Sequence, residues 1–380
     1  MKFRTKAIHV GNQRCPSTGA VVPPIHLATT YVQDTPGEWG DYDYSRSGNP
    51  TRDNMEDTLA ALEQGFEALG FASGIAAIHC VTMLFNSGDH ILAGSDIYGG
   101  TYRLFHKICS RAGIQVSLVD TSNPANLADA IQPNTKLIWI ESPGNPLMSI
   151  TDIAECGKIA SQAGVLIGID NTFATPALTQ PLTLGIDIVM HSATKYLGGH
   201  SDALGGALVV KSQELYDQLY YIQNATGNCM APLESFLISR GMKTLDLRVR
   251  AQSEAAARIA DYLDNDSRVQ RVLYPGLASH PGHDVAARQM KGAFGAILSF
   301  EVTGGFEKAK AVAAKTKLFQ LAVSLGAVES LIEQPASMSH ASYDREDRIK
   351  HGITDELIRL SVGLEDVDDL IADLDQALDA

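Results

Sequence analysis

The chain has 380 residues, of which 45% are hydrophobic and 19% charged, so it can bury the cores of about two soluble globular domains. Its 30 Lys and Arg residues against 44 Asp and Glu give a net charge of −14, which argues against nucleic acid as a partner. Five cysteines without a CxxC pair give no support to a disulfide framework or a zinc ribbon and fit a reducing compartment. Neither a signal peptide nor an apolar run of membrane length is found, so we expect a cytoplasmic protein with no membrane partner.

The segment 15–50 is rich in Pro, Gly and polar turn formers and has no helical period. So long an extended segment is improbable inside a compact domain, and we expect it to lie across a neighbouring subunit. Residues 1–46 are therefore assigned to an extended N-terminal arm that contacts this neighbour.

A helix is predicted to begin directly after this arm. Asn49 is a good capping residue, Pro50 fits the first helical position, and Gly65 is a stop signal. The apolar residues on one face between these signals are Met55, Leu59 and Leu62.

Short apolar runs then alternate with helical stretches such as 74–86 and 101–113. The expected strands are 66–72, 89–95, 114–120, 136–142, 165–170, 186–192 and 204–210. Strands that are apolar on both faces, with helices between several of them, predict a mainly parallel sheet covered on both sides. We assign residues 47–241 to this larger domain.

The pattern changes after residue 241. A long helix is expected over 245–263, strands over 294–302 and 357–363, and an amphipathic helix at the end of the chain. The segment 242–380 is therefore assigned to a smaller α+β domain.

Polar, small or aromatic residues follow several of the predicted strands, where a parallel α/β sheet gathers its ligands. These residues are Gly74, Ile75, Tyr98, Asn145, Asp170, Ser192, Thr194 and Lys195. The stretch FASGIAA also brings small residues to a helix start, which can bind an anion such as phosphate or can be an ordinary tight turn.

Two of these residues suggest a specific chemistry. Asp170 could keep a pyridinium nitrogen protonated, although Asp also ends many strands without a function. Lys195 is 25 residues further on (195 − 170), enough for one crossover and a strand that returns to the same sheet edge. A desolvated lysine there could form a Schiff base, whereas a lone lysine is usually a surface charge.

The stretch DIVMHSATKYLGGHS resembles the lysine signature of the Cys/Met-metabolism pyridoxal-phosphate enzymes. YSRSGNPTR, DIYGGTYRLF, IDNTFATP and LIRLSVGLED are similar to further landmarks of that family, in its order. The resemblance implies an aspartate-aminotransferase-like fold of type I, with a mainly parallel seven-stranded sheet and a smaller C-terminal domain. It also implies a homotetramer of two dimers with shared active sites and pyridoxal 5′-phosphate as the cofactor.

The resemblance also implies roles for individual residues. Lys195 matches the Schiff-base lysine, Asp170 the partner of the ring nitrogen, and Tyr98 the tyrosine that stacks on the ring and takes part in proton transfer. The phosphate cradle is expected to consist of Gly74, Ile75, Ser192 and Thr194, with Tyr44 and Arg46 of the adjacent subunit.

Arg359 is a lone charge within an apolar strand. It could form a buried ion pair with a structural carboxylate, or it could hold a substrate α-carboxylate through two hydrogen bonds. The family resemblance favours the substrate role, with Ser324 and Asn145 nearby.

The expected reaction is α,γ-elimination of cystathionine, the activity of a cystathionine gamma-lyase. A cystathionine gamma-synthase is the alternative, followed by a methionine or homocysteine gamma-lyase. Asp43 could meet a distal ammonium group, whereas Val323 stands where cystathionine-processing relatives usually have Glu. Methionine gamma-lyases typically carry Cys where this chain has Gly100.

Other functional classes have less support. A nicotinamide-dependent dehydrogenase would need a GxGxxG fingerprint, which the chain lacks, and no Walker A sequence occurs. A non-catalytic relative would be expected to have lost Lys195 or Asp170. His280 and His283 have no evident third ligand, and Pro-Gly between them indicates a turn rather than a metal site.

Overall fold

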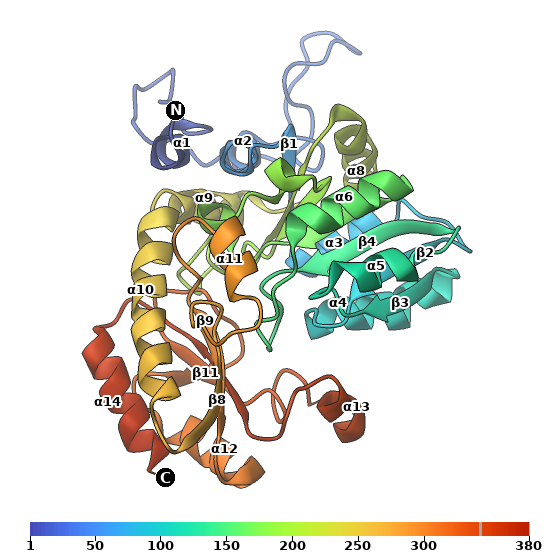
Figure 1. Cartoon of the computed structure of the whole chain (residues 1–380). Coiled ribbons are helices and arrows are strands. Elements are labelled where there is room, and N and C mark those ends of the chain that lie inside the picture. The colour runs from blue at the N-terminus through green and yellow to red at the C-terminus, as the bar shows by residue number, and fades with distance from the viewer. Residues whose placement is uncertain (342–343, 380) are drawn as a thin grey trace.

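The computed structural model describes residues 1–341 and 344–379. Its first sheet has seven strands in the order β1-β7-β6-β5-β4-β2-β3. Figure 1 labels β4, β2 and β3 at one side of this sheet. Only β7 runs antiparallel to its neighbours, so the prediction of a mainly parallel seven-stranded sheet is confirmed. The strands are β1 (Glu67–Phe71), β2 (His90–Gly94), β3 (Gln115–Val119), β4 (Thr135–Glu141), β5 (Leu166–Asp170), β6 (Ile188–His191) and β7 (Gly206–Val210).

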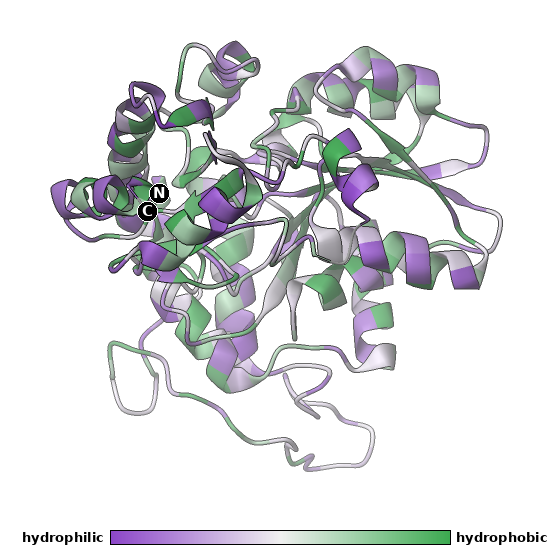
Figure 2. Ribbon diagram, turned by 90° about the horizontal axis from the view of Figure 1, so that it is seen from below, coloured by the Kyte–Doolittle hydropathy of each residue, from purple (hydrophilic) through white to green (hydrophobic). Residues whose placement is uncertain are grey.

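Helices cover both faces of this sheet, and successive strand residues face different cores. Ile138 and Ile140 of β4 pack in one buried cluster, whereas Leu137 and Trp139 pack in another. Figure 2 shows the same layering, with the strands inside and the hydrophilic faces of the helices outside. The helices of this part are α2 (Pro50–Glu63), α3 (Gly74–Thr82), α4 (Gly99–Arg103), α5 (Pro124–Ala130), α6 (Ile153–Ala163), α7 (Thr175–Leu178), α8 (Gln213–Thr226) and α9 (Pro232–Met242).

Helix α2 begins as the sequence predicts. The Asn49 side chain accepts hydrogen bonds from the N–H groups of Thr51 and Arg52, with Pro50 in the first turn. The helix ends at Gln64, whose φ of +60° is left-handed. Gly65 follows because a Cβ there would lie 2.3 Å from a methyl carbon of Val209, so only glycine allows this approach to β7.

The predicted helix over 101–113 is helical but irregular. Helix α4 passes into a π-helical segment, Leu104–Ile108, and then into a 3-10 segment, Cys109–Ala112. Phe105 in the π segment is buried edge-on against Trp139 of β4, with ring centroids 6.3 Å apart. Gly113, at φ +80°, ends the stretch.

The second sheet has five strands in the order β10-β11-β12-β9-β8 and is antiparallel except between β10 and β11. Its strands are β8 (Val269–Leu273), β9 (Ile297–Val302), β10 (Gln320–Leu321), β11 (Leu331–Glu333) and β12 (Leu357–Ser361). The helices of this part are α10 (Leu245–Asp264), α11 (His283–Gln289), α12 (Gly305–Lys315), α13 (Arg345–Lys350) and α14 (Val367–Leu378). No helix in the described residues is long and apolar enough to cross a bilayer.

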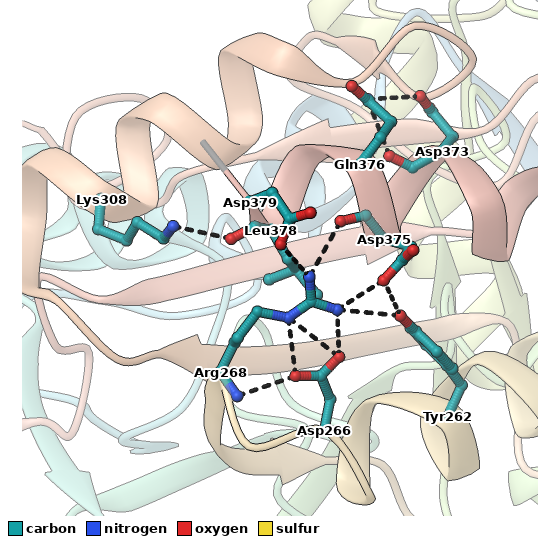
Figure 3. A network of polar contacts seen from close by, with 9 residues as sticks. All are labelled: Tyr262, Asp266, Arg268, Lys308, Asp373, Asp375, Gln376, Leu378 and Asp379. Carbon is teal, nitrogen blue, oxygen red and sulfur yellow. Dashed lines mark hydrogen bonds and ion pairs between the residues drawn. The ribbon is translucent and has the colours of Figure 1, made fainter.

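An arginine fixes the end of α14 to the second sheet. The Arg268 guanidinium lies 2.5 Å from Asp266, 2.6 Å from Asp375 and 2.5 Å from Asp379 (Figure 3). Tyr262 of α10 donates to Asp375 as well, over 2.8 Å. The turn between α10 and β8 is thereby joined to the C-terminal helix.

The N-terminal segment is partly packed on this body and partly extended from it. A short helix that the sequence did not predict, α1 (Phe3–His9), packs on α2, and residues 10–49 then contain neither helix nor strand, as expected of an extended arm (Figure 1). The pairing of Thr30 with Tyr44 is an isolated bridge. Large apolar side chains on this segment are exposed, including Val21, Leu27, Val32 and Trp39.

Candidate functional site

A cavity of about 360 Å³ lies at the carboxyl ends of β4, β5 and β6 and reaches β11 and β12 of the second sheet. It therefore occupies the position where open α/β sheets bind their ligands. The predicted site residues that line it are Gly74, Ile75, Tyr98, Asn145, Asp170, Ser192, Thr194, Lys195, Val323, Ser324 and Arg359. Tyr44, Arg46 and Asp43 of the same chain do not.

Lys195 follows β6 and its side chain is largely buried. Burial and, to a smaller extent, the neighbouring Arg359 guanidinium lower the pKa of the amine from 10.5 to about 8, against the opposite effect of Glu333 and Asp170. The amine Nζ lies 2.5 Å from the hydroxyl oxygen of Ser324. A substantial neutral fraction is therefore available near neutral pH, as a nucleophile or a base requires.

Two carboxyl groups lie side by side at the ends of β4 and β5. Glu141 pairs in register with Asp170, and both are buried. Burial and the charge of Asp170 raise the pKa of Glu141 well above its ordinary value. Burial also raises the pKa of Asp170, but the N–H of Thr172, His191 and Lys195 stabilise its anion. Burial thus raises the pKa of both groups, and Glu141 has fewer partners than Asp170 to oppose that rise.

The start of α3 also lines the cavity. Ser73 caps this helix by accepting the N–H of Ala76, and the first N–H groups of a helix have no partner within it. A Cβ on Gly74 would lie 3.2 Å from the Cβ of Ser192, so glycine allows the helix start to approach β6 closely. The Thr194 hydroxyl is paired with Gly205, donating to its carbonyl and accepting its N–H over 3.1 Å each.

Tyr98 stands at the entrance, immediately before α4, and is 42% exposed. Its N–H donates to Glu141 over 2.8 Å, which anchors the loop to the end of β4. The ring lies against Gly100, where an added Cβ would come within 2.3 Å of a ring carbon.

Arg359 on β12 forms the buried ion pair that the sequence left open, and its role toward a substrate stays a prediction. It forms a buried ion pair with Glu333 of β11, with Nη1 and Oε1 3.0 Å apart. It also lines the cavity and donates to the Asn145 side chain over 2.9 Å and to the Ser324 carbonyl over 2.8 Å. Its buried Nε has no hydrogen-bond partner in the described structure.

The residues of the arm lie elsewhere. Tyr44 is 45% exposed, and Arg46 donates to Asn224 over 3.2 Å. The Asp43 carboxylate accepts the N–H of Tyr44 over 2.6 Å. None of these side chains reaches the cavity of its own chain, so their expected contact with a neighbouring subunit stays a prediction.

Several cavity residues escaped the sequence analysis, notably Glu141, Glu333 and Arg103. The signal that singled out Arg359, a charge inside an apolar strand, was equally present at Glu141 and Glu333. Arg103 lies on the irregular helix at the cavity, and its guanidinium forms no hydrogen bond or ion pair with the residues that the structure describes.

The two histidines of the SHPGH stretch have ordinary backbone partners. His280 accepts the N–H of Gly282 over 3.0 Å, and the His283 ring lies 2.9 Å from the Pro275 carbonyl. Within residues 1–341 and 344–379, no group of three His, Cys, Asp or Glu side chains is arranged to hold a metal ion.

The sequence model of the Cys/Met metabolism PLP-dependent enzymes matches residues 4–379 of the chain. The chain belongs to this family. Its relatives include a cystathionine gamma-lyase from Bacillus subtilis, 51% identical over all of both chains, and a cystathionine beta-lyase from Lactococcus lactis subsp. cremoris, 48% identical over 99% of each. Other relatives are named cystathionine gamma-synthase.

Solved structures agree with this family assignment. The crystal structure of cystathionine gamma-lyase from Lactobacillus plantarum complexed with L-serine is 47% identical, with a TM-score of 0.97 over 100% of this chain and 99% of that one. The fold of type I expected from the family resemblance is confirmed.

The cofactor of the family is pyridoxal phosphate, and the cavity fits it. The buried Lys195 amine, with its lowered pKa, is suited to react with the aldehyde of the cofactor. The buried Asp170 carboxylate is suited to pair with the ring nitrogen, and the N–H groups at the start of α3 are suited to bind the phosphate. All three groups line one cavity.

Proposed function

We propose that the protein is a cystathionine gamma-lyase, which converts L-cystathionine into cysteine, 2-oxobutanoate and ammonia. The observation that carries the proposal is a second guanidinium, that of Arg103, in the cavity that also contains Lys195 and Arg359. Cystathionine has a carboxylate at each end, so two arginines can bind it at both ends, whereas methionine offers one carboxylate only.

Within this proposal, different residues hold the aldehyde, the ring nitrogen and the phosphate of the cofactor. Lys195 binds the aldehyde and Asp170 the ring nitrogen, while the N–H groups of Gly74 and Ile75 bind the phosphate. Ser192 and Thr194 complete the phosphate contacts with their hydroxyl groups, for which Thr194 exchanges its bonds with Gly205. Bound pyridoxal phosphate supplies the electron sink for bond cleavage at the substrate.

The other residues bind the substrate and move protons. Arg359 and Asn145 hold the α-carboxylate, and Ser324 lies between Arg359 and the Lys195 amine. Lys195 Nζ takes the proton from the substrate Cα, which its pKa of about 8 allows near neutral pH. Tyr98 at the entrance donates a proton to the departing sulfur.

The environment of Gly100 argues against a methionine gamma-lyase. A cysteine there would bring its Cβ within 2.3 Å of the Tyr98 ring, so the ring position in this chain depends on glycine. Val323, which is apolar and exposed at the cavity, itself offers the distal ammonium of cystathionine no acidic partner. Asp43 of a neighbouring arm could supply that partner.

We also propose that the protein is a homotetramer in which Tyr44, Arg46 and Asp43 complete the cavity of the neighbouring subunit. The exposed apolar side chains of the arm support a covering partner. Co-expression of Lys195→Ala with Arg46→Ala chains tests the shared site. Mixed oligomers should recover activity that neither variant has alone, and the absence of recovery would place the phosphate contact within one chain.

Product analysis tests the proposed reaction. The purified holoenzyme is given cystathionine, and separately an O-acylated homoserine with cysteine. Cysteine and 2-oxobutanoate from cystathionine support the gamma-lyase. Homocysteine and pyruvate would identify a beta-lyase, and cystathionine formed from the ester would identify a gamma-synthase.

A substitution of Arg103 tests whether the cavity binds a substrate with two carboxylates. Arg103→Ala should raise the KM for cystathionine about tenfold while changing the KM for methionine little, because one charge-assisted contact is lost. Lys195→Ala, which lacks the reacting amine, serves as the inactive control. An equal effect of Arg103→Ala on both substrates would contradict the second carboxylate contact.

A further inference from the structure

Glu63, the last residue of α2, is fully buried behind the cavity. Its Oε1 accepts a hydrogen bond from the Asn171 side chain over 3.0 Å and lies 2.6 Å from Nε2 of His191. A carboxylate at the C-terminal end of a helix is unfavourable to the helix dipole, and an unpaired buried carboxylate is very costly. The two donors are therefore what keeps Glu63 in this place.

Both donors are direct neighbours of residues that line the cavity. Asn171 follows Asp170 at the end of β5, and His191 precedes Ser192 at the end of β6. The N–H of Asn171 donates to the Met190 carbonyl over 3.0 Å, which joins the two strand ends. Glu63 thus ties the carboxyl ends of both strands to one helix, although neither Glu63 nor His191 lines the cavity.

The pair also has an electrostatic consequence. The His191 Nε2–H donates to the Glu63 carboxylate over 2.6 Å, while the other ring nitrogen, Nδ1, is buried with no hydrogen-bond partner among the described residues. His191 and Lys195 both act to lower the pKa of Asp170, against burial, which raises it. Burial lowers the pKa of Lys291, and Glu63 acts in the opposite direction. Loss of the Glu63 acceptor would therefore release the His191 ring from its place beside the end of β5.

We propose that Glu63 and His191 are positioning residues for the cofactor: together they align the ends of β5 and β6 and so place Asp170 against the cofactor ring. The proposal rests on the cofactor contact proposed for Asp170 and is independent of which substrate the enzyme uses. It predicts that changes at Glu63, outside the cavity, weaken cofactor binding and alter the electronic state of the bound cofactor.

The test compares Glu63→Gln and His191→Gln with two reference variants. Asp373→Asn is the matched control, because Asp373 is also a buried carboxylate, accepting the N–H groups of Lys317, Leu318 and Phe319 in the second sheet's domain. Asp170→Asn is the positive reference. Each chain is freed of cofactor and titrated with pyridoxal phosphate, and bound cofactor is followed by its visible absorption.

Glu63→Gln and His191→Gln should each raise the Kd for pyridoxal phosphate about tenfold, with Asp373→Asn unchanged. The pH midpoint of the visible band should also rise in both variants, because a ring nitrogen that loses its anionic partner gives up positive charge. A merely structural role would lower thermal stability and leave this midpoint where it is. Because the two variants probe the same pair, the result from either one is decisive if the other does not fold.

The positioning role would be overturned if Glu63→Gln bound pyridoxal phosphate with wild-type affinity and an unchanged pH midpoint of the visible band, while Asp170→Asn bound it weakly. Wild-type affinity in Asp170→Asn as well would instead show that Asp170 does not contact the cofactor, and the inference would fall with it. Neither the affinity nor the midpoint measurement uses cystathionine. A failure of the proposed reaction would therefore be detected only by product analysis and not by these measurements.

Discussion

The Lys195 amine lies 2.5 Å from the hydroxyl oxygen of Ser324, which belongs to the loop before β11. Ser324 has a φ of +101°, a backbone conformation that costs a non-glycine residue about 1–3 kcal/mol. Its carbonyl accepts a hydrogen bond from Arg359 as well. The strained residue thus connects the amine with the arginine proposed to bind the substrate.

Ser324→Gly and Ser324→Ala separate the strain from the hydroxyl. Glycine should stabilise the chain by about 1 kcal/mol, because it adopts positive φ freely, while both variants lose the contact with Lys195 and should show a lower kcat. Thermal unfolding and steady-state kinetics measure the two effects. Wild-type kcat in both variants would show that the hydroxyl has no part in positioning the amine.

The lowered pKa of Lys195 predicts the pH dependence of cofactor uptake. Only the neutral amine reacts with an aldehyde, and the amine becomes neutral as pH rises through about 8 rather than 10.5. The rate at which cofactor-free chains gain visible absorption with pyridoxal phosphate should therefore rise with a midpoint near pH 8. Arg359→Gln, which removes a positive neighbour, should move this midpoint upward; a wild-type midpoint near pH 10 would contradict the desolvation of the amine.

Arg268→Ala should destabilise the chain by about 1 kcal/mol, because the partly exposed network that holds α14 loses its centre. Arg268 lowers the pKa of Asp266 from 3.8 to about 2, so this stabilisation is present above pH 4 and is lost as pH falls toward 2. Urea unfolding of the wild type and the variant at a series of pH values measures the difference.

The exposed pair of Arg258 and Asp368 is the control for this network, since it also joins α10 to α14 through one arginine. Arg258→Ala should change the free energy of unfolding by less than about 0.5 kcal/mol. If the Arg268 and Arg258 variants lost the same free energy of unfolding, the several carboxylates around Arg268 would contribute no more to stability than a single exposed pair.

Val323→Glu should favour cystathionine over methionine. The new carboxylate would stand at the cavity, where it can pair with the distal ammonium that only cystathionine has, and a solvent-exposed pair is worth a factor of about 2–5. The ratio of kcat/KM for the two substrates measures the change. Val323→Gln, of the same size without the charge, should leave the ratio near that of the wild type, and a similar rise in both variants would exclude an ionic cause.

Much of the first sheet could be predicted because its strands are apolar on both faces and are separated by clear stop signals. The same pattern placed Asp170 and Lys195 at one sheet edge, since parallel strands end on the same side. Local signals also predicted the start of α2, where Asn49 and Pro50 satisfy the first turn without help from distant residues.

Contacts between residues that lie far apart in the sequence could not be predicted from these local signals. Glu333 pairs with Arg359 through the register of β11 and β12, which local sequence does not define. The irregular helix after Gly99 follows from tertiary contacts such as that of Phe105 with Trp139, and α1 is too short to give a clear period. The contacts expected of Tyr44 and Arg46 are with a second copy of the chain, so they stay a prediction.

The antiparallel strand β7 has a mechanical consequence. Since β6 and β7 are neighbours, the segment between them leaves and re-enters the same sheet, so Lys195 and Asp170 belong to one rigid unit. Ser324 and Arg359 belong to the segment that builds the other sheet. A hinge rotation of one sheet against the other would open the gap between amine and hydroxyl and leave the amine's separation from Asp170 unchanged.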